Sequence, residues 1–183
     1  MTGNVQMVIG SWGSYNDCNE RALGSKWLDL SDYTSWEEIE KELEREGFEL
    51  NGTDEELFVQ DCEGILGFCG DSTHPKEIFE TCLKTGILND VDKHRVATAY
   101  LEVRSWSDFK ELVDKYGTDW DRDITLYENM TVEEVLEEMI EDCYSIDFSE
   151  LGWLGNYVTI DYEAMARDSD NYYEVASGTL KID

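Results

Sequence analysis

The stretch TVEEVLEEMIEDC, residues 131–143, combines an apolar stripe with an unbroken acidic face. Its apolar side chains recur at intervals of three and four residues, which is the period of an amphipathic helix. Thr131 and Glu134 have the spacing of a capping box, so the helix is predicted to begin here. The stripe comprises Val132, Val135, Leu136, Met139, Ile140 and Cys143, and the acidic face comprises Glu133, Glu134, Glu137, Glu138, Glu141 and Asp142.

Like charges on this face stand four residues apart, at 133/137, 134/138, 137/141 and 138/142. Each pair costs roughly 0.2 to 0.5 kcal/mol, so the face destabilises the helix by about 1 to 2 kcal/mol. At about 1.5 Å rise per residue the helix carries one charge per roughly 2.3 Å of axis, against about 1.7 Å for duplex DNA. The pattern indicates a cationic partner, adaptation to high salt, or an ordinary acidic surface.

Acidic residues dominate the whole chain, with 43 Asp and Glu against 14 Lys and Arg and a net charge of -29 on 183 residues. The excess lies in the outer thirds, because residues 1–60 carry -10, residues 61–105 carry -3 and residues 106–183 carry -16. Such a surface repels nucleic acid and anionic lipid, so we expect no direct nucleic-acid binding and no membrane association. Any electrostatic partner should be basic.

Hydrophobic residues make up 41% of the chain and aromatic residues 12%, which is enough for a folded core. No stretch approaches 18 apolar residues, and the first residues lack the basic segment of a signal peptide. The five cysteines are widely spaced, with no C-x-x-C pair. We therefore expect a cytoplasmic protein with free thiols, no metal and no other cofactor.

Periodicity and turn residues predict an α+β fold, an elongated chain of three small domains. Residues 1–60 read as a small mixed α/β unit, residues 61–105 as a central helical bundle, and residues 106–183 as a C-terminal α+β unit. The predicted strands are 4–11, 26–30, 57–59, 124–127 and 157–160, with a hairpin across Ser177-Gly178. The predicted helices are 36–46, Pro75 to Gly86, 90–103, 107–116, 131–143 and 162–167. The helix at 36–46 has a Ser35/Glu38 capping box and Gly47 at its end.

Catalytic chemistry finds little support. The chain has two histidines, His74 and His94, and neither stands in a nucleophile or metal motif. It has no G-x-S-x-G, no phosphate-binding loop and no dinucleotide fingerprint. We therefore expect a protein that is not an enzyme.

One aspartate cluster imitates part of a calcium-binding loop. Asp119, Asp121 and Asp123 match the first, third and fifth positions of that loop. Ile124 stands where glycine is required, and Met130 stands where a bidentate glutamate belongs. The sequence thus favours loose cation condensation over a specific site, with a divalent-cation-binding protein as one alternative function.

Three segments together resemble the ArdA family of antirestriction proteins. VIGSWGSYNDCNERALGSKWLDL, residues 8–30, is similar to the opening of that family, with a G-[ST]-W-x-x-Y-N loop and a W-x-D-L strand. ELFVQDCEGI, residues 56–65, resembles its D-x-E-G passage into the middle domain. LGNYVTIDYEAMARD, residues 154–168, resembles its D-Y-E-A-x-x-R-D signature. Their order and spacing cover nearly the whole chain.

The resemblance implies a dimeric DNA mimic that occupies the DNA-binding groove of type I restriction-modification enzymes. The partner would be the methyltransferase core with its specificity subunit. It would competitively inhibit restriction and modification. The phosphate-mimicking carboxylates would then be Glu37, Glu38, Glu40, Glu42, Glu44, Glu46, Asp119, Asp121, Asp123, Glu133, Glu134, Glu137, Glu138, Glu141 and Asp142. The homodimer interface, which the signature implies, would include Leu151, Trp153, Leu154, Tyr157, Asp161, Tyr162 and Glu163.

The main alternative from the residues alone is an acidic, salt-adapted cytosolic protein of unrelated function. If the acid serves a partner, the protein should remain folded in dilute buffer, because its fold does not rely on salt to screen its charges. Thermal unfolding in dilute buffer and in about molar salt measures this. A chain that unfolds or aggregates in dilute buffer and recovers in molar salt would support salt adaptation instead.

Overall fold

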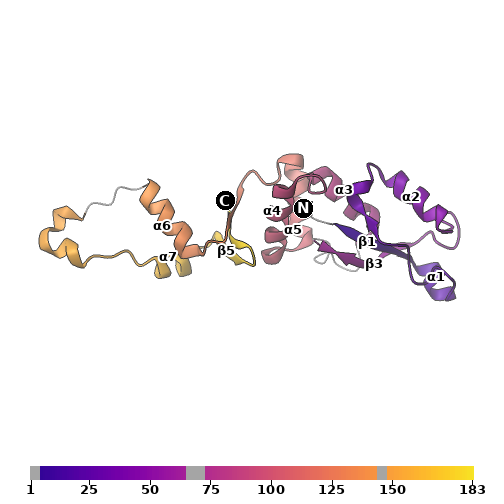
Figure 1. The fold of residues 1–183 in the computed structure, drawn as a ribbon, viewed down its shortest axis with the longest axis horizontal. Coiled ribbons are helices and arrows are strands. Elements are labelled where there is room, and N and C mark those ends of the chain that lie inside the picture. Colours follow the sequence, from indigo (N-terminus) through magenta and orange to yellow (C-terminus); the bar gives the residue numbers. More distant parts are fainter. Residues whose placement is uncertain (1–4, 65–72, 144–147) are drawn as a thin grey trace. The chain divides into compact units, whose positions relative to one another are not determined.

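The computed structural model describes residues 5–64, 73–143 and 148–183 (Figure 1). The chain forms two compact units, residues 1–122 and 123–183. Each unit contains helices and a small antiparallel sheet, so the predicted α+β fold is confirmed. The division into three domains stays a prediction. Within the described residues, no helix has the length and apolar character needed to span a membrane.

The sheet of the first unit has the strand order β2-β1-β3, and all its pairs are antiparallel. β1 (Gln6–Ser11) is central and almost wholly buried, with β3 (Leu57–Glu63) along one side. β2 is reduced to Leu28–Asp29 and continues as the 3₁₀ turn η1 (Leu30–Asp32). The three strands predicted for this region are therefore confirmed. β3 runs on to Glu63, into a stretch that the sequence assigned to the helical block.

A short helix occupies a stretch that the sequence predicted as loop. α1 (Trp12–Asp17) begins after Ser11, whose hydroxyl accepts a hydrogen bond from the Ser14 amide at 3.1 Å. It ends at Cys18, which has a left-handed backbone with φ of 50°. The six residues are rich in Gly, Ser, Asn and Asp and show no helical period, so local pattern gave no sign of the helix.

α2 (Trp36–Arg45) follows the sequence prediction closely. Trp36, Ile39 and Leu43 are buried on its inner side. Its end is a Schellman motif, because the amides of Gly47 and the next residue donate to carbonyls of the last turn at 3.0 Å. Gly47 has a φ of +93°, a conformation that a residue with a Cβ rarely adopts.

The capping box predicted for α2 is wrong. The Ser35 side chain makes no capping hydrogen bond to the helix. The Glu38 carboxylate instead accepts from the Thr34 amide at 2.7 Å and from the Thr34 hydroxyl at 3.1 Å. The S-x-x-E pattern predicted that Glu38 would pair with Ser35. Glu38 is instead the partner of Thr34, one residue before the expected cap.

Three predicted helices, here called the central helices, are confirmed as α3 (Pro75–Thr85), α4 (Val91–Val103) and α5 (Trp106–Tyr116), followed by the 3₁₀ turn η3 (Gly117–Asp119). The sequence assigned the first two to the central block and the third to the C-terminal unit, whereas α5 lies in the first compact unit. Leu83 of α3 is 39% exposed, whereas Ile78, Phe79 and Cys82 are buried. Residues 65–72, which the sequence also assigned to this block, lie outside the described residues.

An aromatic cluster forms the core of the central helices. Phe109 lies at its centre, with ring centroids of Tyr100, Trp106 and Trp120 at 5.9, 5.6 and 5.0 Å. Trp120 is fully buried, and its indole donates to the Thr85 carbonyl at 3.2 Å. The indole thus links the residue after η3 to the end of α3.

The sheet of the second unit has the strand order β4-β6-β5. β4 (Ile124–Glu128) pairs with β6 (Gly178–Ile182), and β5 (Tyr172–Val175) pairs with the other side of β6. The predicted hairpin is confirmed, but its register differs by one residue. Val175 pairs with Gly178, so the loop consists of Ala176 and Ser177.

Two helices and a 3₁₀ segment complete the second unit. α6 (Val132–Cys143) has the predicted capping box, because the Thr131 amide donates to Glu134 at 2.9 Å and the Glu134 amide donates to the Thr131 hydroxyl at 3.3 Å. α7 (Tyr162–Asp168) is the predicted helical turn. η4 (Ser149–Tyr157) was not predicted.

The strand predicted at residues 157–160 is wrong. Tyr157 ends η4, and residues 158–160 belong to no helix or strand. Val158, Thr159 and Ile160 are β-branched and favour extended backbone. A strand also needs a neighbour, and none of the described strands pairs with this stretch.

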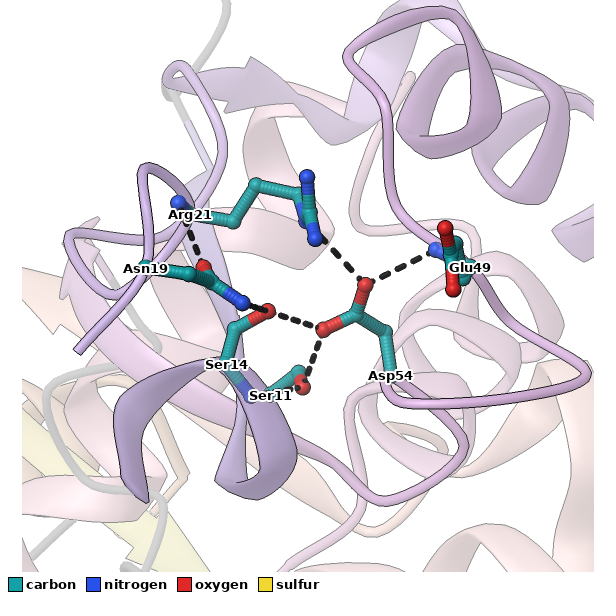
Figure 2. Close-up of polar contacts among 6 residues, drawn as sticks. All are labelled: Ser11, Ser14, Asn19, Arg21, Glu49 and Asp54. Atoms are coloured by element: carbon teal, nitrogen blue, oxygen red, sulfur yellow. Dashed lines mark hydrogen bonds and ion pairs between the residues drawn. The ribbon is translucent and has the colours of Figure 1, made fainter. Parts of the chain in front are cut away.

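One buried carboxylate ties together the long loops of the first unit (Figure 2). Asp54, which has no exposed surface, accepts from the Ser11 hydroxyl at 2.6 Å and from the Ser14 hydroxyl through one oxygen. Its other oxygen accepts from Arg21 Nε at 3.2 Å and from the Glu49 amide at 2.8 Å. Residues 11–14 and Arg21, which lie more than thirty residues before Asp54, thus converge with Glu49 on a single side chain.

These contacts decide the charge state of Asp54. Burial alone raises the pKa of this carboxyl, because it removes water from the charged form. The hydrogen bonds from Ser11, Ser14 and the Glu49 amide, together with the charge of Arg21, outweigh burial and hold the pKa below its usual value. Asp54 is therefore an ionised, fully satisfied buried acid at neutral pH.

We predict that Asp54→Asn lowers the free energy of unfolding by about 3 kcal/mol at neutral pH, because it removes the buried charge that Arg21 and the donors face. Asp54 has a lower pKa folded than unfolded, so its contribution is complete above about pH 4, the usual unfolded value, and is lost as the pH falls through the folded pKa. Urea unfolding of both proteins across pH measures the difference. Asp17→Asn, at an exposed acid of α1, is the control. A difference that stays constant down to pH 3 would contradict the assignment.

Candidate functional site: the acidic helical faces

α6 presents the most continuous acidic face in the described residues. Val132, Val135 and Leu136 are buried, which turns the opposite side of the helix to solvent. No Lys or Arg stands within the helix. Toward its end the apolar stripe is less covered, and Cys143 is exposed. The exposed carboxylates are those of Glu134, Glu137, Glu138, Glu141 and Asp142.

Glu133 differs from the other acids of α6. It is half-buried and lines a shallow hollow shared with α7 and β5. Glu163 and Glu174 line the same hollow together with Arg167. A guanidinium among three carboxylates offsets part of their repulsion. Glu133 is therefore directed toward its own unit rather than fully outward, which the sequence pattern did not distinguish.

α7 contacts α6 and lies beside its acidic side. Burial, with the nearby carboxylates of Glu137 and Glu141, raises the pKa of the Tyr162 phenol above its usual value. The Tyr172 hydroxyl from β5 approaches Met139 Sδ at 3.5 Å. Tyr162 and Tyr172 thus lie near the second half of α6, and Tyr162, predicted at a dimer interface, has neighbours within its own unit.

α2 contains five glutamates, and a sixth, Glu46, is its C-cap. The helix also contains Lys41 and Arg45, so its acidic face is interrupted. Glu37, Glu38 and Glu44 are exposed. Besides Glu38, which accepts from Thr34, glutamates with partners in the fold are Glu40, which accepts from Trp36 Nε1 at 2.8 Å, Glu42, which pairs with Arg45 at 2.8 Å, and Glu46, which accepts from the Lys26 amide at 2.9 Å.

Local hydrogen bonds keep the first acids of α2 charged. The backbone and side chain of Thr34 lower the pKa of Glu38. A hydrogen bond to its own backbone and one to Ser35 lower the pKa of Glu37. Negative charge at a helix N-terminus is also stabilised by the helix dipole. Both carboxylates are therefore anionic at neutral pH.

The three aspartates of the calcium-like pattern have separate environments. Asp119 is exposed, while Asp121 forms an ion pair with Lys93 at 3.8 Å. Asp123 belongs to the second unit, where its carbonyl accepts from the Asp183 amide at 2.9 Å. Within residues 5–64, 73–143 and 148–183, no three His, Cys, Asp or Glu side chains are grouped so that they could hold a metal ion.

The predicted dimer residues of η4 form an exposed apolar surface. Trp153 and Tyr157 are 72% and 77% exposed, and their rings meet edge to face at 6.0 Å between centroids. Leu151 and Leu154 are 49% and 50% exposed. Aromatic residues with this exposure are typical of surfaces that bind another protein.

The D-Y-E-A stretch has a local structural role. Asp161 is the N-cap of α7, and its carboxylate accepts from the Ala164 amide at 2.9 Å. Glu163 lines the hollow beside Arg167. These two predicted interface residues thus shape α7 and its surroundings.

The two histidines have structural surroundings. His74 is the N-cap of α3, and its Nδ1 accepts from the Lys76 amide at 3.2 Å. His94 is half-buried in α4, and burial lowers the pKa of its imidazole. In the part of the chain that the structure describes, neither imidazole is hydrogen-bonded to a carboxylate, hydroxyl or thiol side chain in the way that a general base requires.

The tryptophans of the first unit differ in exposure. Trp36 is 4% exposed and belongs to the core. Trp12 and Trp27 are 46% and 44% exposed in the first unit. The pattern offered no signal for this, because residue type alone does not tell a core tryptophan from an exposed one.

One protein family matches nearly the whole chain. The ArdA family, described as antirestriction protein (ArdA), matches residues 7–181. All three segments that carry the sequence resemblance lie within this range. No curated protein sequence matches the chain. The chain therefore belongs to the ArdA family of antirestriction proteins, which are non-enzymatic inhibitors of type I restriction.

Proposed function

We propose that the protein inhibits type I restriction-modification enzymes as a DNA mimic. Its exposed carboxylates would occupy the DNA-binding groove of the methyltransferase core and specificity subunit, and would compete with DNA for both restriction and modification. The observation that carries this proposal is the outer face of α6, with exposed acids at Glu134, Glu137, Glu138 and Glu141 and no basic residue along the helix.

Electrostatics explains why such a face would bind a DNA-binding enzyme. Unpaired like charges along α6 repel one another, at a cost of about 1 to 2 kcal/mol in the free protein. A groove that binds phosphates is lined with Lys and Arg, whose charges attract the carboxylates and relieve that repulsion. Competition therefore needs a dense track of charge rather than an atomic copy of DNA.

α2 would supply a second part of this track. Glu37, Glu38 and Glu44 are exposed, and the pKa values of the first two are lowered, which favours the charged form. Glu40, Glu42 and Glu46 have partners within the fold, so they would contribute less. The exposed Asp119 would contribute more than Asp121, which is paired with Lys93.

We further infer that the functional form is a homodimer, joined through η4. Four apolar side chains exposed there, those of Leu151, Trp153, Leu154 and Tyr157, support this assignment. Burying a large aromatic side chain contributes about 1.5 to 3 kcal/mol. This apolar surface carries one acid, Glu150, so two copies could meet here with little repulsion.

We predict that the quadruple variant Glu134→Gln, Glu137→Gln, Glu138→Gln, Glu141→Gln competes more weakly with DNA and with a shallower salt dependence. Each lost contact between carboxylate and cation should reduce the slope of log K against log salt by about 0.9, as it does for a phosphate. Competition with a labelled DNA site for a purified type I methyltransferase, from roughly 50 to 200 mM salt, measures both quantities.

A matched control removes four charges from exposed acids of the central helices, by changing Glu80, Glu102, Glu111 and Asp114 to the amides. The control alters the net charge by the same amount but leaves the acids of α6 in place. The salt slope should therefore change more in the α6 variant than in the control. Equal responses would mean that only net charge matters. Failure of the wild-type protein to compete at all would exclude DNA mimicry.

We predict that Trp153→Ala weakens dimerisation by about 10-fold or more, because a central exposed aromatic acts as a hot spot at such an interface. Sedimentation velocity over a concentration series measures the dissociation constant. Trp27→Ala, which truncates an exposed tryptophan of the first unit, should leave it unchanged. A wild-type protein that stays monomeric throughout the series would contradict the dimer.

A further inference from the structure

The segment GSWGSY, residues 10–15, contains two glycines at points of close approach. A Cβ on Gly10 would lie 2.6 Å from the Phe58 ring, and a Cβ on Gly13 would lie 1.8 Å from the Thr53 carbonyl oxygen. Neither distance is sterically possible, and the Thr53 oxygen is backbone that has no rotamer to move. Gly13 is therefore required to seat the start of α1 against Thr53, and a side chain at Gly10 would displace the Phe58 ring from its place against Trp12.

The two serines of the same segment are directed inward as well. Ser11 and Ser14 are buried, and both hydroxyls donate to Asp54 (Figure 2). Four of the six residues thus fix the segment internally, and the remaining two, Trp12 and Tyr15, are the ones that the fold leaves exposed. α1 has six residues and no apolar period, so the burial of its own side chains does not explain why it is held in place. The contacts of its glycines and serines hold it.

The displayed aromatics form a cluster with Phe58. The Trp12 ring stacks on Phe58 with centroids 4.2 Å apart, and Tyr15 stands edge-on to both rings at 5.9 and 6.4 Å. Trp12 is 46% exposed and Tyr15 is 54% exposed. Rigid, partly exposed aromatic residues are the commonest hot spots of protein interfaces, and their preorganisation lowers the entropy lost on binding.

The surroundings of this cluster indicate the chemistry of its partner. The Trp12 amide donates to the Glu56 carbonyl at 3.0 Å, and the side chains of Glu55 and Glu56 are exposed. Asp17, on α1 itself, is exposed as well. A region that exposes both carboxylates and aromatic rings suits a guanidinium, which pairs with acids and stacks on ring faces. A neutral apolar partner would leave these acids without compensation.

We propose that Trp12, Tyr15 and Phe58 form a second contact that receives an arginine-bearing surface of the type I restriction-modification enzyme. This proposal rests on the proposed function. The aromatic contact adds a component of the affinity that salt does not screen. Carboxylate contacts weaken steeply as salt rises, whereas stacking and apolar burial depend little on ionic strength. The two components therefore separate in a salt titration.

The test uses the full-length protein in competition with a labelled DNA site for a purified type I methyltransferase. Trp12→Ala and Tyr15→Ala should each weaken competition about 5- to 30-fold, the range of interface hot spots. The slope of log K against log salt should stay at the wild-type value, because neither variant removes a charge. Trp12→Phe keeps a ring for stacking and should recover most of the affinity.

Trp27→Ala is the matched control, because Trp27 has nearly the same exposure and no contact with the cluster among the ring pairs of the described residues. Thermal unfolding of each variant separates lost binding from lost folding. If the wild-type protein competes with DNA, and Trp12→Ala and Tyr15→Ala both compete within twofold of it, this proposal is overturned while DNA mimicry stands. A changed salt slope in these variants would overturn it too. Absence of wild-type competition would overturn the proposed function itself.

Discussion

Repulsion between carboxylates is the constraint on which the rest of this structure depends. On α6 it costs about 1 to 2 kcal/mol, while burial of each Val or Leu side chain contributes about 1.5 to 3 kcal/mol. Val132, Val135 and Leu136 are all buried, so burial outweighs repulsion in the first half of the helix. The covering of α6 by α7 and β5, with Arg167 beside Glu133, is therefore a condition for displaying the acids that remain outside.

The same chemical group has two opposite uses in this protein. Asp54 is buried and receives donors from Ser11, Ser14, Arg21 and the Glu49 amide, so its charge organises the loops around β1 and α1. The exposed acids of α6 and α2 face water, and their charge is available to a partner. Environment rather than residue type separates the buried structural carboxylate from the exposed ones. A net charge of -29 is compatible with folding because most of it stays solvated.

Elements with a strong period were predictable from sequence, and those held by distant contacts were not. α6 and the core side of α2 follow from apolar spacing alone. α1 depends on Asp54, which lies about forty residues further along the chain, and its own residues favour loops. Residues 158–160 have the composition of a strand but no neighbouring strand. At the candidate site, the pattern located the acidic faces, and helical spacings of four and three residues place Trp36 beside Glu40 and Arg45 beside Glu42. The contact of Glu46 with the Lys26 amide instead follows from tertiary geometry that no spacing encodes.

Charge and aromatic contacts differ in how they distribute affinity. Within a dense track each carboxylate has neighbours that can take its place, so no one acid is decisive and attraction extends over about 8 to 10 Å at ordinary salt. An array of this kind favours rapid encounter with any cationic groove and discriminates little among them. Trp12 and Tyr15 act only at contact and only in one orientation, because Gly10, Gly13 and Asp54 fix their backbone. Selectivity for one enzyme among many DNA-binding proteins therefore needs the second kind of contact as well as the first.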